Sequence, residues 1–107
     1  MTEAASYSAM GGVATITLNR PEKLNAFNAA MFACLRDGLD RAEADETVRV
    51  VVFSGAGRAF SSGQDLTEKL PFDENGRVDL GPPLARDYNP LALRLIAYPK
   101  ITVAALN

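Results

Sequence analysis

One glycine-rich loop holds the residues with the clearest chemical potential. Residues 54–66 read SGAGRAFSSGQDL, with three glycines and three serines among thirteen positions. A loop of this composition has an unusual backbone path, and it can direct backbone N–H groups at an anion. The matching chemistry is an oxyanion hole, in which fixed N–H donors stabilise charge developing on a thioester or ester oxygen. Gly63 would let the backbone turn sharply, so that the N–H of Gln64 points at the ligand.

Two other interpretations of this loop stay open. Spacing alone favours an ordinary strand-to-helix connection, in which Asp65 caps a short helix running to Leu70. A phosphate-binding loop is the weaker alternative. Its glycines, Gly55-Ala56-Gly57, lack the third glycine of a dinucleotide fingerprint and the Gly-Lys-Ser/Thr ending of a P-loop.

Other candidate groups are few. Arg20 and Lys23 flank a proline and could meet phosphates, although a solvated loop is the simpler interpretation. Cys34 has no nearby cation in the sequence and fits a small core or boundary position. Histidine is absent, which excludes Ser-His-Asp and Cys-His nucleophile systems within this chain. It also removes the commonest zinc ligand, and no metal site is expected.

Length and composition are those of one soluble globular domain. The 107 residues are 48% hydrophobic and 22% charged, which argues against wholesale disorder. The net charge of −2 gives no electrostatic reason to expect nucleic acid. The most apolar runs, 48–53 and 101–106, fall far short of the ~20 residues that span a bilayer. With no targeting segment and a single cysteine, a cytoplasmic location is the default expectation.

Alternating and helical patterns supply the elements that must position the loop. Residues 6–10 and 13–18 alternate around Gly11-Gly12, which predicts a β-hairpin. Asn28 is a plausible N-cap for a helix to about Ala44. The buried face of that helix is expected to hold Met31, Phe32, Leu35, Leu39 and Ala42. The apolar run 48–53 suits a strand of a parallel sheet, so this part is predicted as α/β with a right-handed crossover.

The last third of the chain is less regular. Residues 70–83 are rich in proline, glycine and charge, and we expect a mobile insertion with at most a turn at Asn75-Gly76. A helix is predicted from about Asn89, with Pro90 at its first position. Its buried stripe would hold Leu91, Leu95 and Ile96, and Tyr98-Pro99 would end it. Residues 101–106 then predict another buried strand, placed at a sheet edge or completed by another chain or segment.

Three separated segments carry a family resemblance. Residues 14–26 (ATITLNRPEKLNA), 59–66 (AFSSGQDL) and 99–107 (PKITVAALN) closely resemble the enoyl-CoA hydratase/isomerase (crotonase) superfamily. The intervening helix and strand occur in the same order. Residues 63–66, 79–82 and 88–91 look most like its branch of phenylacetate-degrading isomerases. The resemblance implies an α/β, crotonase-like spiral of ββα units. Residues 1–107 would form the N-terminal part of one such domain, which is truncated to less than half.

The resemblance also implies a site and a partner. The partner would be an acyl-CoA thioester, with coenzyme A as part of the substrate and no separate cofactor. Gln64, presented by Gly63, would donate its backbone N–H to the thioester oxygen. The residues implied to line the coenzyme A path, partly through backbone atoms, are Lys23, Leu24, Ala26, Ala59, Ser62, Gln64, Asp65 and Leu66. Lys23 would approach the phosphates of coenzyme A.

Two functions therefore stay in view. The first is an acyl-CoA hydratase or isomerase that stabilises an enolate, assembled like the family as a trimer or a dimer of trimers. In the family the second N–H donor and the acid–base residues follow the segment matched here, so we expect negligible turnover from these residues alone. The second is a catalytically inactive binding or oligomerisation module. A free strand edge at 101–106 predicts self-association.

Overall fold

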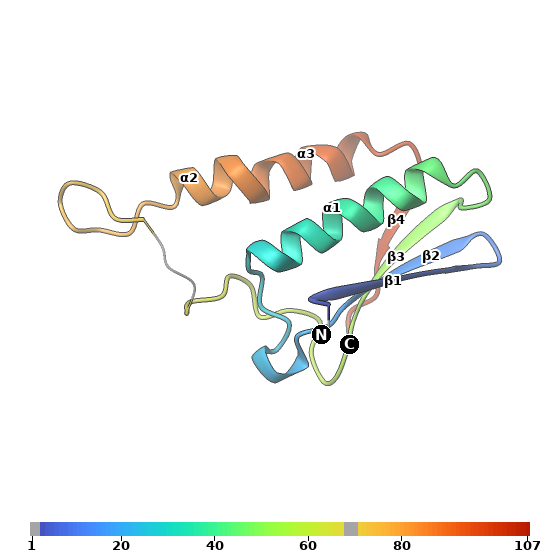
Figure 1. The fold of residues 1–107 in the computed structure, drawn as a ribbon, viewed down its shortest axis with the longest axis horizontal. Helices are drawn as coiled ribbons and strands as arrows, with labels where there is room; N and C mark the ends of the chain where they lie inside the picture. The colour runs from blue at the N-terminus through green and yellow to red at the C-terminus, as the bar shows by residue number, and fades with distance from the viewer. Residues whose placement is uncertain (1–2, 68–70) are drawn as a thin grey trace.

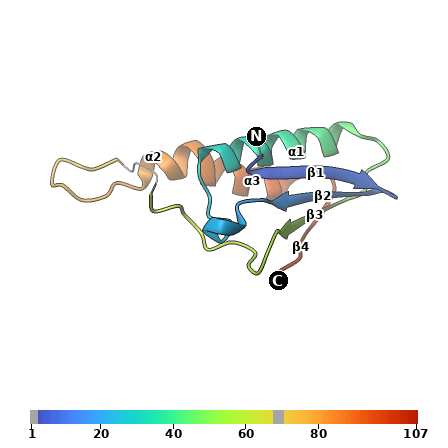
Figure 2. The same cartoon turned by 60° about the horizontal axis from the view of Figure 1, so that its bottom comes forward.

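A four-stranded sheet covered on one face by helices forms the fold. The computed structural model describes residues 3–67 and 71–107 (Figure 1). The strand order is β1-β2-β3-β4, with β1 antiparallel to β2 and the other neighbours parallel. The strands are β1 (Ala5–Met10), β2 (Val13–Leu18), β3 (Val50–Gly55) and β4 (Ile101–Ala104). Figure 2 shows α1 (Ala29–Ala44) and α3 (Asn89–Ala97) on the same side of this sheet. The predicted α/β architecture is confirmed.

Local sequence explains the hairpin and the start of β3. Gly11 and Gly12 have φ values of 60° and 83°, and two positive values match the tight turn that follows the twist of paired strands. β3 begins two residues later than predicted because Val48 N–H bonds back to Asp45 at 3.0 Å, which makes a turn. The hairpin itself is confirmed.

Helix α1 supplies the main core contact, as its pattern predicted. Asn28 caps it, because the Asn28 Oδ1 accepts a hydrogen bond from Met31 N–H at 2.8 Å. The buried face of α1 packs on alternate residues of β2 and on β3. The buried core comprises Ala5, Ala14, Ile16, Leu18, Met31, Leu35, Leu39, Ala42, Val48 and Val51. Cys34 lies partly buried beside this core, where the sequence placed it.

The helix in the last third begins earlier than predicted. One continuous helical run starts at α2 (Gly81–Pro83), passes through a π-helical turn, η2 (Leu84–Tyr88), and continues as α3. Asp79 Oδ1 accepts a hydrogen bond from Gly81 N–H at 2.9 Å just before this run, while the N-cap residue, Leu80, makes no side-chain cap. The wide turn brings Asn89 N–H to Leu84 C=O, and it accommodates Pro90, which would otherwise disrupt a regular helix interior.

Two predictions of burial were wrong. Leu91 and Leu95 pack beside the core, but Ile96 is 83% exposed because it lies on the outer face of α3. The apolar run after Lys100 is not buried either, because β4 is an edge strand with an uncovered face. Its register places Ile101 and Val103 on the sheet face opposite the helices, where they are 65% and 43% exposed.

Residues 71–80 form a small turn. Phe72 and Val78 make an antiparallel bridge around Asn75-Gly76, where the turn was predicted. Leu70, the first residue of the predicted insertion, lies outside the described residues, and the mobility of this segment stays a prediction. Among the helices of residues 3–67 and 71–107, none is long and apolar enough to cross a membrane.

Lys100 ties the C-terminal end of α1 to the loop before β4. Its Nζ donates hydrogen bonds to the carbonyl oxygens of Ala42 and Asp45 at 2.5 and 2.7 Å. These oxygens have no partner within the helix. We expect Lys100→Met to lower the free energy of unfolding by about 1–3 kcal/mol, because it keeps the aliphatic stem but removes a charged donor. Urea denaturation measures this, and an unchanged midpoint would contradict it.

Candidate functional site

A buried asparagine joins two loops that the sequence singled out separately. Asn25 lies just after η1 (Pro21–Lys23), is fully buried and has a left-handed φ of 55°. Its Nδ2 donates hydrogen bonds to the carbonyl oxygens of Ala56 and Ala59 at 2.9 and 2.8 Å. Its Oδ1 accepts from Arg20 N–H at 2.8 Å. Asn25 therefore fixes the loop after β2 against the glycine-rich loop after β3.

A parallel bridge between Phe27 and Gln64 makes the second link. Phe27 N–H donates to Gly63 C=O at 2.7 Å, and Asp65 N–H donates to Phe27 C=O at 2.9 Å. Parallel pairing of this kind uses the residues on either side of Gln64, so the Gln64 N–H points away from Phe27. Within the described residues, this N–H donates no hydrogen bond. An amide held rigidly and left without an internal partner is the arrangement that an oxyanion donor requires.

Gly63 and Ser61 shape the backbone just before this amide. Gly63 has a φ of 97°, a conformation that residues with a Cβ rarely adopt. Its N–H donates to Ser61 Oγ at 3.1 Å, and the same hydroxyl donates to Asn25 C=O at 2.8 Å. The turn that presents Gln64 is therefore anchored to the buried asparagine.

Arg20 and Asp65 form a mostly buried ion pair behind the loops. Arg20 Nη2 lies 2.8 Å from Asp65 Oδ2, and Arg20 Nη1 donates to Ala26 C=O at 2.6 Å. The hypothesis that Arg20 meets phosphates is not supported, because these contacts commit its guanidinium to the fold. Asp65 Oδ1 also accepts from Thr67 N–H and Oγ1, which caps a turn. The helix predicted to run from this cap to Leu70 extends into residues outside those described.

Acid should weaken this pair. Hydrogen bonds from the Thr67 hydroxyl and amide, and then from Arg20, lower the pKa of Asp65 from 3.8 to about 2. Because the folded state favours the ionised carboxylate, its contribution is present above the unfolded pKa of ~3.9 and is lost as pH falls toward 2. We expect Asp65→Asn to be less stable at neutral pH and to lose less stability between pH 5 and 3 than the parent. Thermal unfolding across that range measures it, and parallel pH profiles would contradict it.

The other predicted residues gather along the same two loops. Ser62 N–H donates to Leu24 C=O at 2.9 Å, which places the two segments side by side. Leu24 and Ala59 are half-buried and Ala26 is buried, whereas Lys23, Ser62 and Leu66 are exposed. The structure thus brings all of these residues to one region, with Asp65 turned inward toward Arg20.

An apolar cavity of about 270 Å³ adjoins Gln64, and sequence reasoning missed its other walls. The lining residues are Gln64, Leu80, Pro83, Leu84 and Tyr88. Four of these come from the first part of the helical run. Leu80 and Pro83 fell in the predicted insertion, and Leu84 and Tyr88 lay between that insertion and the predicted helix. The available signal was Gly81-Pro82-Pro83, which places proline in the first turn of a helix.

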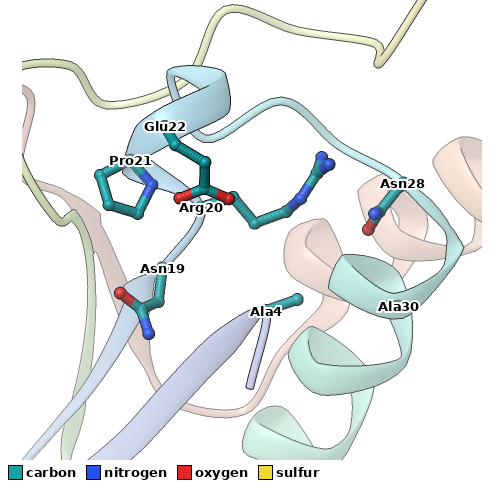
Figure 3. Close-up of a pocket in the computed structure, with 7 residues that line it drawn as sticks. All are labelled: Ala4, Asn19, Arg20, Pro21, Glu22, Asn28 and Ala30. Atoms are coloured by element: carbon teal, nitrogen blue, oxygen red, sulfur yellow. The ribbon is translucent and has the colours of Figure 1, made fainter. Parts of the chain in front are cut away.

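A second, more polar cavity has Arg20 in its wall. It measures about 530 Å³ and opens between the start of β1, the end of β2 and the start of α1 (Figure 3). Its lining residues are Ala4, Asn19, Arg20, Pro21, Glu22, Asn28 and Ala30. This cavity does not include Gln64. Among residues 3–67 and 71–107, no group of three or more Cys, Asp or Glu side chains is placed to hold a metal ion.

Comparisons with known proteins agree with this fold. The family model described as enoyl-CoA hydratase/isomerase matches residues 8–107. The structure superposes on an enoyl-CoA hydratase/isomerase from Xanthobacter autotrophicus Py2 with a TM-score of 0.85 at 37% identity, covering 100% of this chain and 39% of that one. The α/β fold is therefore the N-terminal part of a crotonase fold, and the chain belongs to the enoyl-CoA hydratase/isomerase family.

Two curated relatives are similar in sequence over most of this chain. The chain is 46% identical to 1,2-epoxyphenylacetyl-CoA isomerase of Escherichia coli (strain K12) over 96 residues, which cover 90% of this chain and 37% of the relative. It is 42% identical to a putative enoyl-CoA hydratase of Thermus thermophilus over 102 residues, covering 91% and 38% respectively. The chain thus spans less than two fifths of the length of these relatives.

Proposed function

We propose that this chain binds a coenzyme A thioester and donates the Gln64 N–H to the thioester carbonyl oxygen. The observation that carries the proposal is the Gln64 amide, which is fixed on both sides by Phe27 and has no partner in the described fold. A hydrogen bond to the carbonyl polarises it and stabilises negative charge as an enolate forms. One such donor is typically worth about 2.7–4 kcal/mol of barrier.

The coenzyme A portion would follow the two joined loops. Leu24, Ala26, Ala59, Ser62, Asp65 and Leu66 would offer mainly backbone atoms and small side chains. Lys23 is exposed at the end of η1, so its ammonium group can approach the phosphates. Arg20 is excluded from this role by its ion pair with Asp65.

The acyl group would enter the cavity beside Gln64. A volume of about 270 Å³ lies just below the usual range of ligand pockets, which favours a compact apolar acyl group over a long chain. The family description favours hydration or isomerisation as the reaction class, and the reaction would pass through an enolate that the Gln64 N–H stabilises. The acid–base groups of such a reaction have no candidate among the residues of this site.

Calorimetric titration of the protein with acetyl-CoA and with coenzyme A tests the proposal. We expect acetyl-CoA to bind more tightly than coenzyme A, because only the thioester offers the carbonyl and the acyl group. Leu84→Asp should weaken acetyl-CoA binding selectively, since it places a charge in the cavity wall. Lys23→Ala is the matched control and should weaken both ligands alike. Absence of binding by either ligand would overturn the proposal.

A module that acts through assembly is the second candidate, favoured by one surface. The sheet face opposite the helices exposes Met10, Ile101 and Val103, and β4 has a free edge. An apolar face beside an open strand edge promotes pairing between chains. We expect the protein to self-associate in sedimentation experiments, and Val103→Lys to reduce this association. A parent protein that stays monomeric at high concentration would contradict this function.

A further inference from the structure

Tyr88 connects the wall of the acyl cavity to the residue that carries the candidate amide. It lies at the end of η2, and its hydroxyl donates a hydrogen bond to Gln64 Oε1, 24 residues away in the chain. Both side chains line the 270 Å³ cavity. This hydrogen bond therefore joins the helical run to the glycine-rich loop through side chains alone.

The ring of Tyr88 reaches the same loop by a second route. It packs edge-on against Phe32 at 4.7 Å and Phe27 at 6.2 Å between ring centroids. Phe27 is the residue whose backbone pairs with Gly63 and Asp65. Tyr88 therefore contacts the Gln64 side chain through its hydroxyl, and through its ring it contacts Phe27, the residue bridged to Gln64.

The hydrogen bond between these two side chains also affects the polarity of the cavity. Tyr88 and Gln64 are the polar residues among its lining, and the Tyr88 hydroxyl donates to the side-chain carbonyl of Gln64. Without the hydroxyl, the Gln64 side-chain carbonyl would lose its partner in an apolar setting, which is costly for a partly buried polar group. The Gln64 side chain would then be free to enter the cavity, and the position of the Gln64 backbone N–H would change with it.

The turn geometry explains why Tyr88 stands at this place. The five-residue π-helical turn Leu84–Tyr88 precedes Pro90 and relieves the conflict that a proline causes in a helix. Turns of this kind occur often at functional sites. The turn ends on Tyr88, while Leu84 at its start lines the same cavity.

We propose that Tyr88 is a positioning residue. By holding the Gln64 side chain it fixes the Gln64 backbone N–H relative to the acyl cavity, so that an acyl group in the cavity aligns its thioester carbonyl with that N–H. This inference rests on the proposed function, in which the Gln64 backbone N–H donates a hydrogen bond to the thioester carbonyl. In this proposal Tyr88 acts through Gln64 and does not contact the reacting atoms.

Infrared spectroscopy of acetyl-CoA labelled with ¹³C at the thioester carbonyl tests the proposal. The parent protein should shift the carbonyl stretch to lower frequency on binding, and Tyr88→Phe should reduce that shift. Thioester affinity should fall about three- to tenfold, the usual effect of one hydrogen bond, while affinity for free coenzyme A stays the same. An unchanged shift and affinity in Tyr88→Phe would overturn the positioning role.

Two comparisons separate positioning from general loss of structure. Tyr98→Phe removes another hydroxyl, which donates to Leu39 C=O at 2.7 Å away from the site, and should leave the carbonyl frequency unchanged. In a Gln64→Met background, which keeps the backbone N–H, Tyr88→Phe should change affinity less than twofold, because its partner is already gone. An equal effect of Tyr88→Phe in both backgrounds would contradict the proposal.

A measurement without ligand keeps the two proposals distinguishable. The ¹H–¹⁵N NMR signal of the Gln64 backbone amide should move in ligand-free Tyr88→Phe and stay in place in Tyr98→Phe. If the parent protein bound no thioester, the proposed function would fail. A Gln64 signal unmoved by Tyr88→Phe would overturn the positioning role, whatever the result of the binding experiment.

Discussion

Asn25→Ala should destabilise the protein by about 3–5 kcal/mol and abolish thioester binding. The substitution leaves three polar backbone groups without their partner, namely the carbonyls of Ala56 and Ala59 and the N–H of Arg20. Each buried unpaired group costs about 1–3 kcal/mol. Alanine also tolerates the left-handed φ of 55° less well than asparagine. Chemical denaturation and calorimetric titration measure the two effects.

Asn28→Ala is the matched control for this prediction. It removes the side-chain cap of α1, a single hydrogen bond to Met31 N–H at a helix start. Loss of such a cap costs about 1 kcal/mol. Binding should survive, because Asn28 holds no part of the glycine-rich loop. Equal losses of stability in the two variants would show that Asn25 does not organise the site.

Gly55→Ala should cost about 3 kcal/mol or more and weaken thioester binding strongly. Gly55 ends β3 and does not have a left-handed φ. Alanine is therefore opposed there by steric contact and not by backbone conformation. A Cβ there would lie 2.5 Å from Ala59 O and 2.7 Å from Phe60 Cα, both backbone atoms that cannot rotate away. The loop must shift to make room, and a forced backbone shift costs at least as much as ordinary overpacking. The shift would be transmitted toward Gln64.

Gly38→Ala provides the comparison. Its Cβ would also be close to a neighbour, 2.8 Å from Ile16 Cδ1, but that atom is the end of a flexible side chain. Alanine is also favoured over glycine in a helix by about 1 kcal/mol, which offsets part of the strain. We expect a smaller loss of stability and unchanged binding. Circular dichroism melts and titration with acetyl-CoA distinguish the variants, and a Gly55→Ala protein as stable as the parent would contradict the steric account.

Local patterns predicted the first half of the fold because each signal there has one structural meaning. Gly11-Gly12 permits two positive φ values, Asn28 caps a helix, and the spacing from Met31 to Ala42 defines one buried face. These features depend on neighbours within a few residues. The parallel pairing of β3 followed from its continuous apolar run.

The start of the helical run at Gly81 was missed because the proline, glycine and charge content of residues 70–83 predicted an insertion. Pro82 and Pro83 lie in the first turn, where their missing N–H groups would be unpaired in any case. Pro90 was taken as a helix start, yet the π-helical turn before it absorbs the conflict. A wide turn has no simple sequence signature, so the continuation of the helix from Pro83 through Leu84 to Tyr88 was not predicted.

The sequence singled out both loops of the candidate site, but it did not predict the contacts that connect them. Gly63 and Gln64 were predicted as site residues from glycine spacing and family resemblance. The role of Asn25 depends on contacts more than thirty residues away in the chain, and these arise only when β2 and β3 pair. The same holds for Arg20 and Asp65, which seemed independent and form one ion pair. Long-range polar contacts of this kind follow from the fold and not from local pattern.

The central claim is that the Gln64 amide hydrogen-bonds to a thioester carbonyl. The most direct measurement is the ¹H–¹⁵N NMR signal of that amide during titration with acetyl-CoA and with S-ethyl-CoA, a thioether that lacks only the carbonyl oxygen. We predict that acetyl-CoA moves the Gln64 proton downfield and slows its exchange with water, while the thioether does neither. The same Gln64 response to both ligands, or no response to bound acetyl-CoA, would contradict the account.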